Sequence, residues 1–163
     1  MIGDPCGHRG SYAERLVDSG EVVVHGGIVK FRRQRSDDLG TKQRHVADLF
    51  VETARNLADV HLDYSAGSLD QLEAFVDRLW DPEHPPSEAE LDNLTKLMGA
   101  YLGEVMIRTV DGRWAWDPEG RIPVIETDRG FAFVLDKVYK RQVFGADESL
   151  VAFYRNFQAR ESN

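Results

Sequence analysis

The most informative stretch of this chain is LTKLMGAYLGEVMIRTVDGRWAWD, residues 94–117. Apolar residues recur through its first part at helical spacing, and Gly112 stands where that helix is expected to end. From Arg113 onward, tryptophan alternates with other residues, which is typical of a β-strand. The stretch therefore predicts a long helix that leads directly into a strand, but it names no reaction.

Two glycines mark one face of this helix. Gly99 and Gly103 lie four residues apart, and two glycines inside a helix cost roughly 2 kcal/mol relative to alanine. We expect close approach of another helix or a strand to offset this cost. The alternative is a ligand that lies against the bare backbone.

Tyr101, Glu104 and Arg108 follow one another along the same helix at positions i, i+3 and i+7. The order of Glu104 and Arg108 favours an ion pair, which would tie the helix to the following strands. The functional alternative makes Glu104 a partly buried carboxylate beside an aromatic ring, able to bind a cation or act as a base.

Trp114 and Trp116 are two residues apart, so both are expected on one side of a strand. Such a pair is typical of the core or its rim. The alternative is an aromatic platform for a partner protein, because tryptophan is enriched among the residues that dominate binding interfaces.

Toward the N-terminus, local signals predict a hairpin and two helices before the long one. Gly26-Gly27 separates the expected strands Glu21–His25 and Ile28–Arg33. Ser36–Asp38 is expected to cap a helix of about five turns that extends to Val60. Two capping boxes are predicted to open the second and third helices, Ser68 with Gln71 and Ser87 with Glu90. The proline-rich segment 81–86, DPEHPP, separates these two helices, and the third is expected to continue to Val110.

Toward the C-terminus, two turns at residues 117–120 and 127–130 predict a meander. Its strands are expected at Arg113–Trp116, Arg121–Glu126 and Phe131–Leu135. Two short helices follow at Asp136–Val143 and Glu148–Ala159, the second capped by Asp147. The predicted class is α+β: an N-terminal β-hairpin, three helices, an antiparallel β-meander and two short C-terminal helices.

The bulk composition predicts one domain over residues 1–163, with residues 1–20 as a loosely packed arm. No apolar run approaches the roughly 20 residues that span a bilayer, and the first residues include no apolar signal region. Cys6 is the single cysteine, so no intrachain disulfide can form. These features predict a cytoplasmic protein without a membrane partner.

The net charge of −8 argues against nucleic-acid binding, which needs a basic surface. One local exception is the cluster at residues 30–35, KFRRQR. It is interpreted as a solvated strand end, and the alternative is a phosphate-contacting patch formed by Lys30, Arg32, Arg33 and Arg35.

The chain has no G-x-S-x-G, P-loop, G-x-G-x-x-G or paired C-x-x-C motif. Its five histidines are scattered, and His61 with Asp63 is only a weak suggestion of a metal site. We therefore predict no metal, no cofactor and no catalytic residue. The lack of motifs does not exclude an enzyme, because catalytic groups can converge from distant positions.

Part of the chain resembles small bacterial domains of unknown function. Leu97–Val105 followed by Gly112–Trp114 is similar to their L-G-x-Y-L-G-E-V helix and G-x-W strand. Asp136–Val138, Asp147–Leu150 and Phe153–Arg155 resemble their C-terminal end. The resemblance covers residues 45–158 and implies a bacterial source, but it supplies no catalytic residues.

Two functional hypotheses remain open. The first is a non-enzymatic protein-interaction module, a regulator or immunity-type inhibitor that binds a partner protein or a second copy of itself. Its surface would include Tyr101, Glu104, Arg108, Trp114 and Trp116. The alternative is an enzyme or small-ligand-binding domain with a pocket near Tyr101, Glu104 and Trp114.

Overall fold

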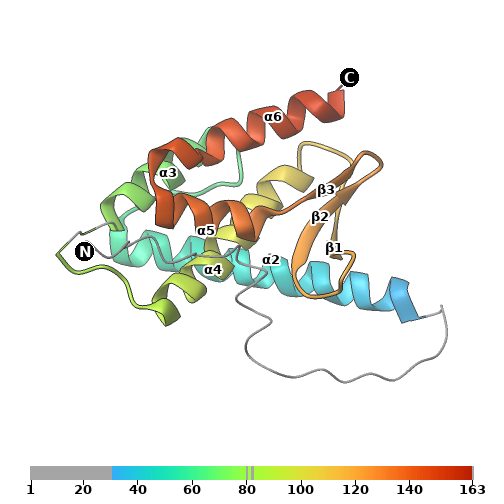
Figure 1. The fold of residues 1–163 in the computed structure, drawn as a ribbon, viewed down its shortest axis with the longest axis horizontal. Helices are drawn as coiled ribbons and strands as arrows, with labels where there is room; N and C mark the ends of the chain where they lie inside the picture. The colour runs from blue at the N-terminus through green and yellow to red at the C-terminus, as the bar shows by residue number, and fades with distance from the viewer. Residues whose placement is uncertain (1–30, 80, 82, 163) are drawn as a thin grey trace, which may run out of the picture.

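The computed structural model describes residues 31–79, 81 and 83–162. Within them, five α-helices flank a three-stranded sheet, as the sequence predicts for an α+β fold (Figure 1). In chain order the elements are α2 Phe31–Ala58, α3 Ser68–Leu79, α4 Glu88–Ile107, β1 Arg113–Trp116, β2 Pro123–Thr127, β3 Gly130–Ala132, α5 Val134–Phe144, the 3-10 turn η1 Ala146–Glu148, and α6 Leu150–Ser162.

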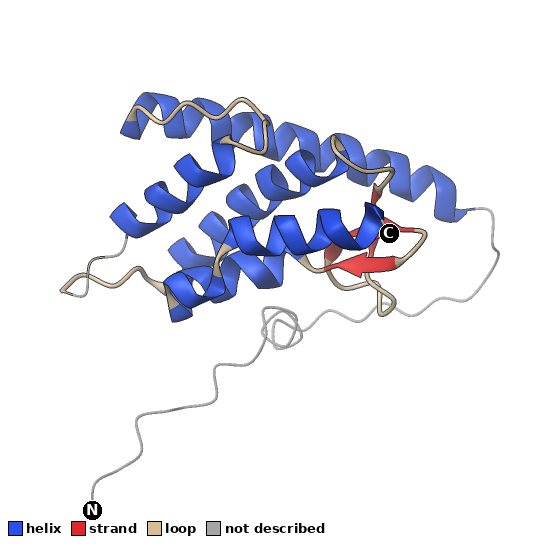
Figure 2. Cartoon of the chain, turned by 90° about the horizontal axis from the view of Figure 1, so that it is seen from above, coloured by secondary structure: helices blue, strands red, loops and turns tan. Residues whose placement is uncertain are grey.

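Helix α4 forms the centre of the molecule. It packs against α2 on one side and α5 on another, and every residue from Met98 to Met106 is buried. A helix that is buried on all sides is typical of a core element. The helices make up most of the body, and the sheet lies at one end of it (Figure 2).

The sheet is an antiparallel meander in the order β1-β2-β3. Trp114, Ile125 and Ala132 lie side by side across it, and all three are buried. The predicted turn between β1 and β2 is confirmed: Asp117 accepts the backbone N–H groups of Arg121 and Ile122 through its carboxylate. These bonds fix the register that places Trp114 in the core.

The N-terminal predictions have two outcomes. The strand Glu21–His25 lies outside the described residues, as do residues 1–20. Residues 31–33, expected to end the second strand, are instead the start of α2, so this part of the prediction is wrong. Ser36–Asp38 accordingly lie inside α2 and do not begin it. Extending a helix adds one hydrogen bond for each residue fixed, whereas a new start requires costly nucleation, which favours the longer helix.

Other element ends also differ from the predictions: α4 ends at Ile107 and not at Val110, and β2 begins at Pro123 and not at Arg121. The third strand ends at Ala132, because Val134 already begins α5. Helix α6 is capped by Ser149, whose hydroxyl accepts the N–H of Ala152, and not by Asp147. Ser68 opens α3 without a capping box, since its hydroxyl bonds to the carbonyl of Ser65 and to Tyr101. The capping box of Ser87 and Glu90 at the start of α4 is confirmed.

Among the helices of the described residues, none is long and apolar enough to cross a membrane.

Candidate functional site

The two glycines of α4 allow neighbouring elements to approach its backbone. A Cβ placed on Gly99 would lie 3.0 Å from Cγ and 3.3 Å from Cα of Leu135 at the start of α5. A Cβ on Gly103 would overlap the indole ring of Trp114. The predicted close approach of a helix and a strand is therefore confirmed, and protein atoms occupy the space where a ligand was the alternative.

Glu104 lies in the core, with only 1% of its surface exposed. Its Oε1 atom accepts a hydrogen bond from Nε1 of Trp114 at 3.0 Å. Its Oε2 atom lies 3.5 Å from Nε of Arg44 on α2, whose side chain is 63% exposed. The carboxylate thus joins α4 to β1 and α2. The predicted pairing with Arg108 is wrong, because Glu104 extends toward α2 and β1 while Arg108 turns toward the loop before α3.

Tyr101 joins α4 to that loop. Its hydroxyl accepts the backbone N–H of Tyr64 at 3.0 Å and shares a hydrogen bond with Ser68. The rings of Tyr64 and Tyr101 are stacked with centroids 4.9 Å apart, and the guanidinium of Arg108 lies 3.7 Å from the centroid of Tyr64. The order Arg108, Tyr64, Tyr101 runs from the surface into the core, so the cation covers an aromatic stack.

The electrostatic setting keeps both tyrosines protonated. Burial raises the pKa of the Tyr101 hydroxyl, and the bonds from Ser68 and Tyr64 offset only part of this effect. Burial also raises the pKa of Tyr64, with a further increase from its hydrogen bond to Asp48. Neither hydroxyl therefore acts as a base at neutral pH.

The five residues singled out from the sequence divide into two groups. Tyr101, Glu104 and Trp114 are at most 2% exposed and pack into the core. Trp116 is 43% exposed at the end of β1, and Arg108 is exposed at the end of α4. The two tryptophans thus lie on the same strand, but Trp114 is buried and Trp116 is exposed. On α4, Tyr101 binds the loop before α3 and Glu104 binds β1, so these two residues anchor the helix to its neighbours.

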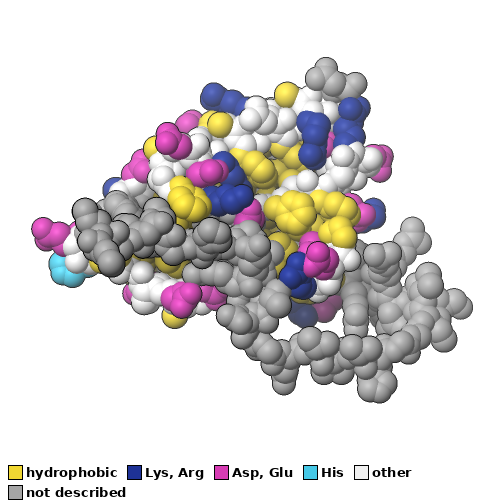
Figure 3. All heavy atoms as spheres, in the orientation of Figure 1, with side chains coloured by type: hydrophobic (Ala, Val, Ile, Leu, Met, Phe, Trp, Pro, Cys, Tyr) yellow, Lys and Arg dark blue, Asp and Glu magenta, His cyan; other side chains and the backbone are white. Residues whose placement is uncertain are grey.

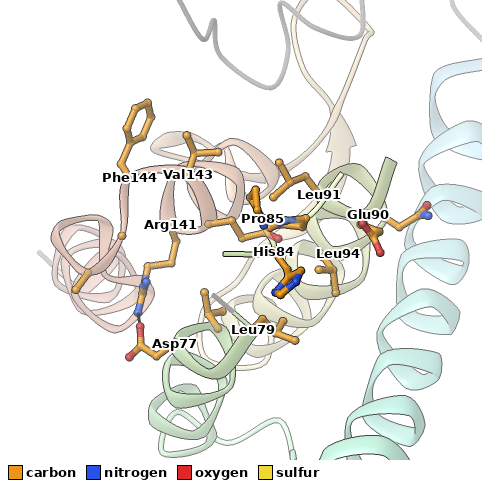
Figure 4. Close-up of a pocket in the computed structure, with 16 residues that line it drawn as sticks. Asp77, Leu79, His84, Pro85, Glu90, Leu91, Leu94, Arg141, Val143 and Phe144 are labelled. Atoms are coloured by element: carbon orange, nitrogen blue, oxygen red, sulfur yellow. Dashed lines mark hydrogen bonds and ion pairs between the residues drawn. The ribbon is translucent and has the colours of Figure 1, made fainter. Parts of the chain in front are cut away.

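A groove opens elsewhere, between the C-terminal ends of α3 and α5 and the first turns of α4 (Figure 4). Its volume is about 850 Å³, and none of the five residues lines it. Apolar side chains contribute much of the lining: Leu79, Pro85, Leu91, Leu94, Val143 and Phe144. Of these, Leu79 is 39% exposed and Phe144 is 55% exposed. On the face drawn in Figure 3, hydrophobic patches are likewise bordered by charged side chains.

A network of paired polar groups lies beside the groove. Arg141 is only 4% exposed, and its guanidinium donates to Glu73 at 2.6 Å and to Asp77 at 2.5 Å. Figure 4 shows Arg141 extending from α5 toward Asp77. Next to it, the buried amide of Gln142 donates to Thr95 of α4 at 2.8 Å. These bonds tie α5 to α3 and α4 next to the groove.

The carboxylate of Glu73 also holds the start of α6. Its Oε1 atom accepts from Ser149 Oγ at 2.8 Å and from the backbone N–H groups of Leu150 and Val151. Burial would raise the pKa of Glu73, but the hydrogen bonds from Arg141, Ser149 and Val151 outweigh it, and the net pKa is lowered. The carboxylate is therefore ionised wherever the domain is folded near neutral pH.

The sequence contained partial signals for this groove. The prolines of segment 81–86 and the break at Phe144-Gly145 were both interpreted only as element ends. Gly145 has φ of 85°, a conformation that favours glycine, and it stops α5 next to the exposed ring of Phe144. The sequence could not show that the proline-rich segment and the end of α5 line the same groove, together with the first turns of α4. In the described residues, no three His, Cys, Asp or Glu side chains gather closely enough to hold a metal ion.

The comparison with known families identifies the family of the chain. Residues 29–156 match the family of unknown function DUF6278. The chain belongs to this family. The match begins well before residue 45, so the DUF6278 domain includes all of α2 and every later element up to the middle of α6. No curated protein and no solved structure matches the chain. Membership therefore assigns no activity, and the function has to be argued from the groove and its surroundings.

Proposed function

We propose that this DUF6278 domain is a non-enzymatic protein-interaction module that receives an apolar segment of a partner protein in the groove between α3, α4 and α5. The observation that carries the proposal is the exposure of Leu79 and Phe144 beside a groove of about 850 Å³. Exposed apolar side chains gathered around a concavity are typical of binding sites, whereas scattered ones need no explanation.

The polar groups of the groove favour binding over catalysis. Arg141 and Gln142 already have protein partners, so they offer little to orient a polar substrate. Among the described residues that line the groove there is no serine, threonine or cysteine, the side chains that most often act as nucleophiles. His84 is bonded to Asp81 at 2.9 Å, but its side chain is 83% exposed, so water surrounds this pair.

The experiment is affinity capture with the full chain from its native cells. We expect a stoichiometric partner protein that is retained by the wild type and lost from Phe144→Ser and Leu79→Ser. Leu57→Ser is the matched control, because Leu57 is 83% exposed on α2 and does not line the groove. Since all three side chains are exposed, the variants should keep the circular dichroism spectrum of the wild type. Retention of the same partner by both groove variants would refute the proposal.

A further inference from the structure

The secondary structure and charge of the bound segment follow from the walls of the groove. We infer that the groove binds an amphipathic α-helix of a partner protein, with basic residues flanking its apolar face. This inference rests on the proposed function and specifies the partner that the same site accepts.

The backbone groups of the walls argue for a helix. The groove is formed by α3, α4, α5 and the loop before α4, and no residue of β1, β2 or β3 lines it. An extended segment binds through a continuous strand edge, which this lining does not include, and the helix ends and the loop before α4 offer only isolated backbone groups. An extended segment would bury unpaired backbone groups here, whereas a helix satisfies its own. Helix-in-groove recognition works in this way.

The apolar side chains that line the groove would contact the apolar face of the bound helix. Leu91 and Leu94 come from α4, and Val143 and Phe144 come from the end of α5. The buried polar atoms beneath them are already bonded, since Arg141 pairs with Glu73 and Asp77. Burial of apolar surface is therefore what these side chains contribute to binding.

The charges around the groove favour basic residues on both sides of the apolar face of the bound helix. Glu90 lines the groove, and the loop beside it carries Asp81 and Glu83, both exposed. Arg141 is the only arginine or lysine among the described residues of the lining, and it is paired with Glu73 and Asp77. Glu90, Asp81 and Glu83 therefore make the rim acidic, within a chain of net charge −8. A second copy would bring an equally acidic rim, so charge complementarity favours a basic partner.

The test uses fluorescent peptides built only of leucine and lysine, with the full-length protein. One peptide spaces the leucines for a helix, and a second, of the same composition, alternates them as in a strand. A third replaces lysine by glutamate at helical spacing. By fluorescence anisotropy, the basic helical peptide should bind at least about tenfold more tightly than the other two, equivalent to about 1.4 kcal/mol.

Variants then locate the peptide on the protein. Phe144→Ser and Leu79→Ser should each weaken binding of the basic helical peptide by about tenfold, and Leu57→Ser should leave it unchanged. Glu83→Lys should weaken it about threefold more than Glu52→Lys, which makes the same charge change on α2, away from the groove. Equal binding of the two basic peptides, or equal binding to all these variants, would overturn the inference.

Other occupants give distinct results. If sedimentation shows a dimer that Phe144→Ser dissociates, a second copy fills the groove and the inference fails. It also fails if a synthetic peptide of residues 1–30 binds in a Phe144-dependent manner and the basic helix does not. If affinity capture depends on Phe144 while the helical peptide binds no better than the alternating one, the proposed function stands and the helix is refuted. If neither measurement depends on Phe144, both fail.

Discussion

At the scale of single residues, the glycines of α4 are explained by what touches them. A methyl group on Gly103 would overlap Trp114 and lie 3.2 Å from Cδ1 of Ile125, and both neighbours are fixed in the core. We expect Gly103→Ala to destabilise the domain by about 1–3 kcal/mol through overpacking. Gly99→Ala should cost less, because its Cβ would lie 3.0 Å from Cγ and 3.3 Å from Cα of Leu135, contacts that a shift of a few tenths of an ångström relieves.

Gly40 on α2 is the matched control, since nothing lies within 4 Å of an added Cβ there. Gly40→Ala should stabilise by about 0.4–1 kcal/mol, because it restricts the unfolded chain. Urea denaturation of the three variants measures all of these changes. A stabilised Gly103→Ala protein would mean that Trp114 is free to move away from α4.

Glu104 gives a second residue-scale prediction. Glu104→Leu leaves the buried indole N–H of Trp114 without its acceptor, and an unsatisfied buried donor costs about 1–3 kcal/mol. Glu104→Gln keeps an oxygen for that N–H and replaces the oxygen that faces Arg44 with an amide NH2, from which the exposed guanidinium can turn to water. We therefore expect Glu104→Leu to be clearly less stable than Glu104→Gln in denaturant melts. Equal losses would show that the carboxylate charge, and not the acceptor, is what the core needs.

At the scale of elements, α6 depends on a carboxylate from α3. Because the pKa of Glu73 is lowered below its ordinary value of 4.5, its contribution to stability is fully present above that pH and is lost as the pH falls through the folded pKa. The wild type should therefore lose stability as the pH drops below about 4.5. Glu73→Gln should be less stable at neutral pH and lose less on acidification. Glu52→Gln, an exposed change on α2, should follow the wild type, and a parallel acid limb for both variants would contradict this role.

Element by element, the sequence predicted the local structure better than the contacts between elements. The bounds of β1 and the turn that follows it agree, because tryptophan alternation and an Asp-Pro-Glu-Gly turn are local signals. The start of α2 was missed, since β-prone residues before Arg33 outweighed helix continuation in the prediction. The predicted ion pair of Glu104 with Arg108 rests on sequence spacing, which shows only which residues are neighbours on the same helix. Its actual partners, Trp114 and Arg44, are brought to it by tertiary packing.

Across the described residues, the core and the groove are separate regions. The cluster of Tyr101, Glu104 and Trp114 is filled by protein side chains, and the groove opens at the first turns of α4, where none of these three residues lines it. The prediction of a pocket near the cluster therefore requires the core to open. The groove requires no such change, which is why the proposed function is placed there.

Ligand-induced stabilisation distinguishes these two regions. A ligand at 100 times its dissociation constant stabilises a folded protein by about 2.7 kcal/mol, which for a domain of this size raises Tm by roughly 5–11 °C. We expect the basic helical peptide to raise the Tm of the wild type and of Glu104→Gln by the same amount, but not that of Phe144→Ser. Metabolites and metal ions should give no shift that Glu104→Gln abolishes. A metabolite shift that disappears in Glu104→Gln and persists in Phe144→Ser would instead locate a ligand in the core cluster, and the interaction module would have to give way to a small-ligand-binding domain.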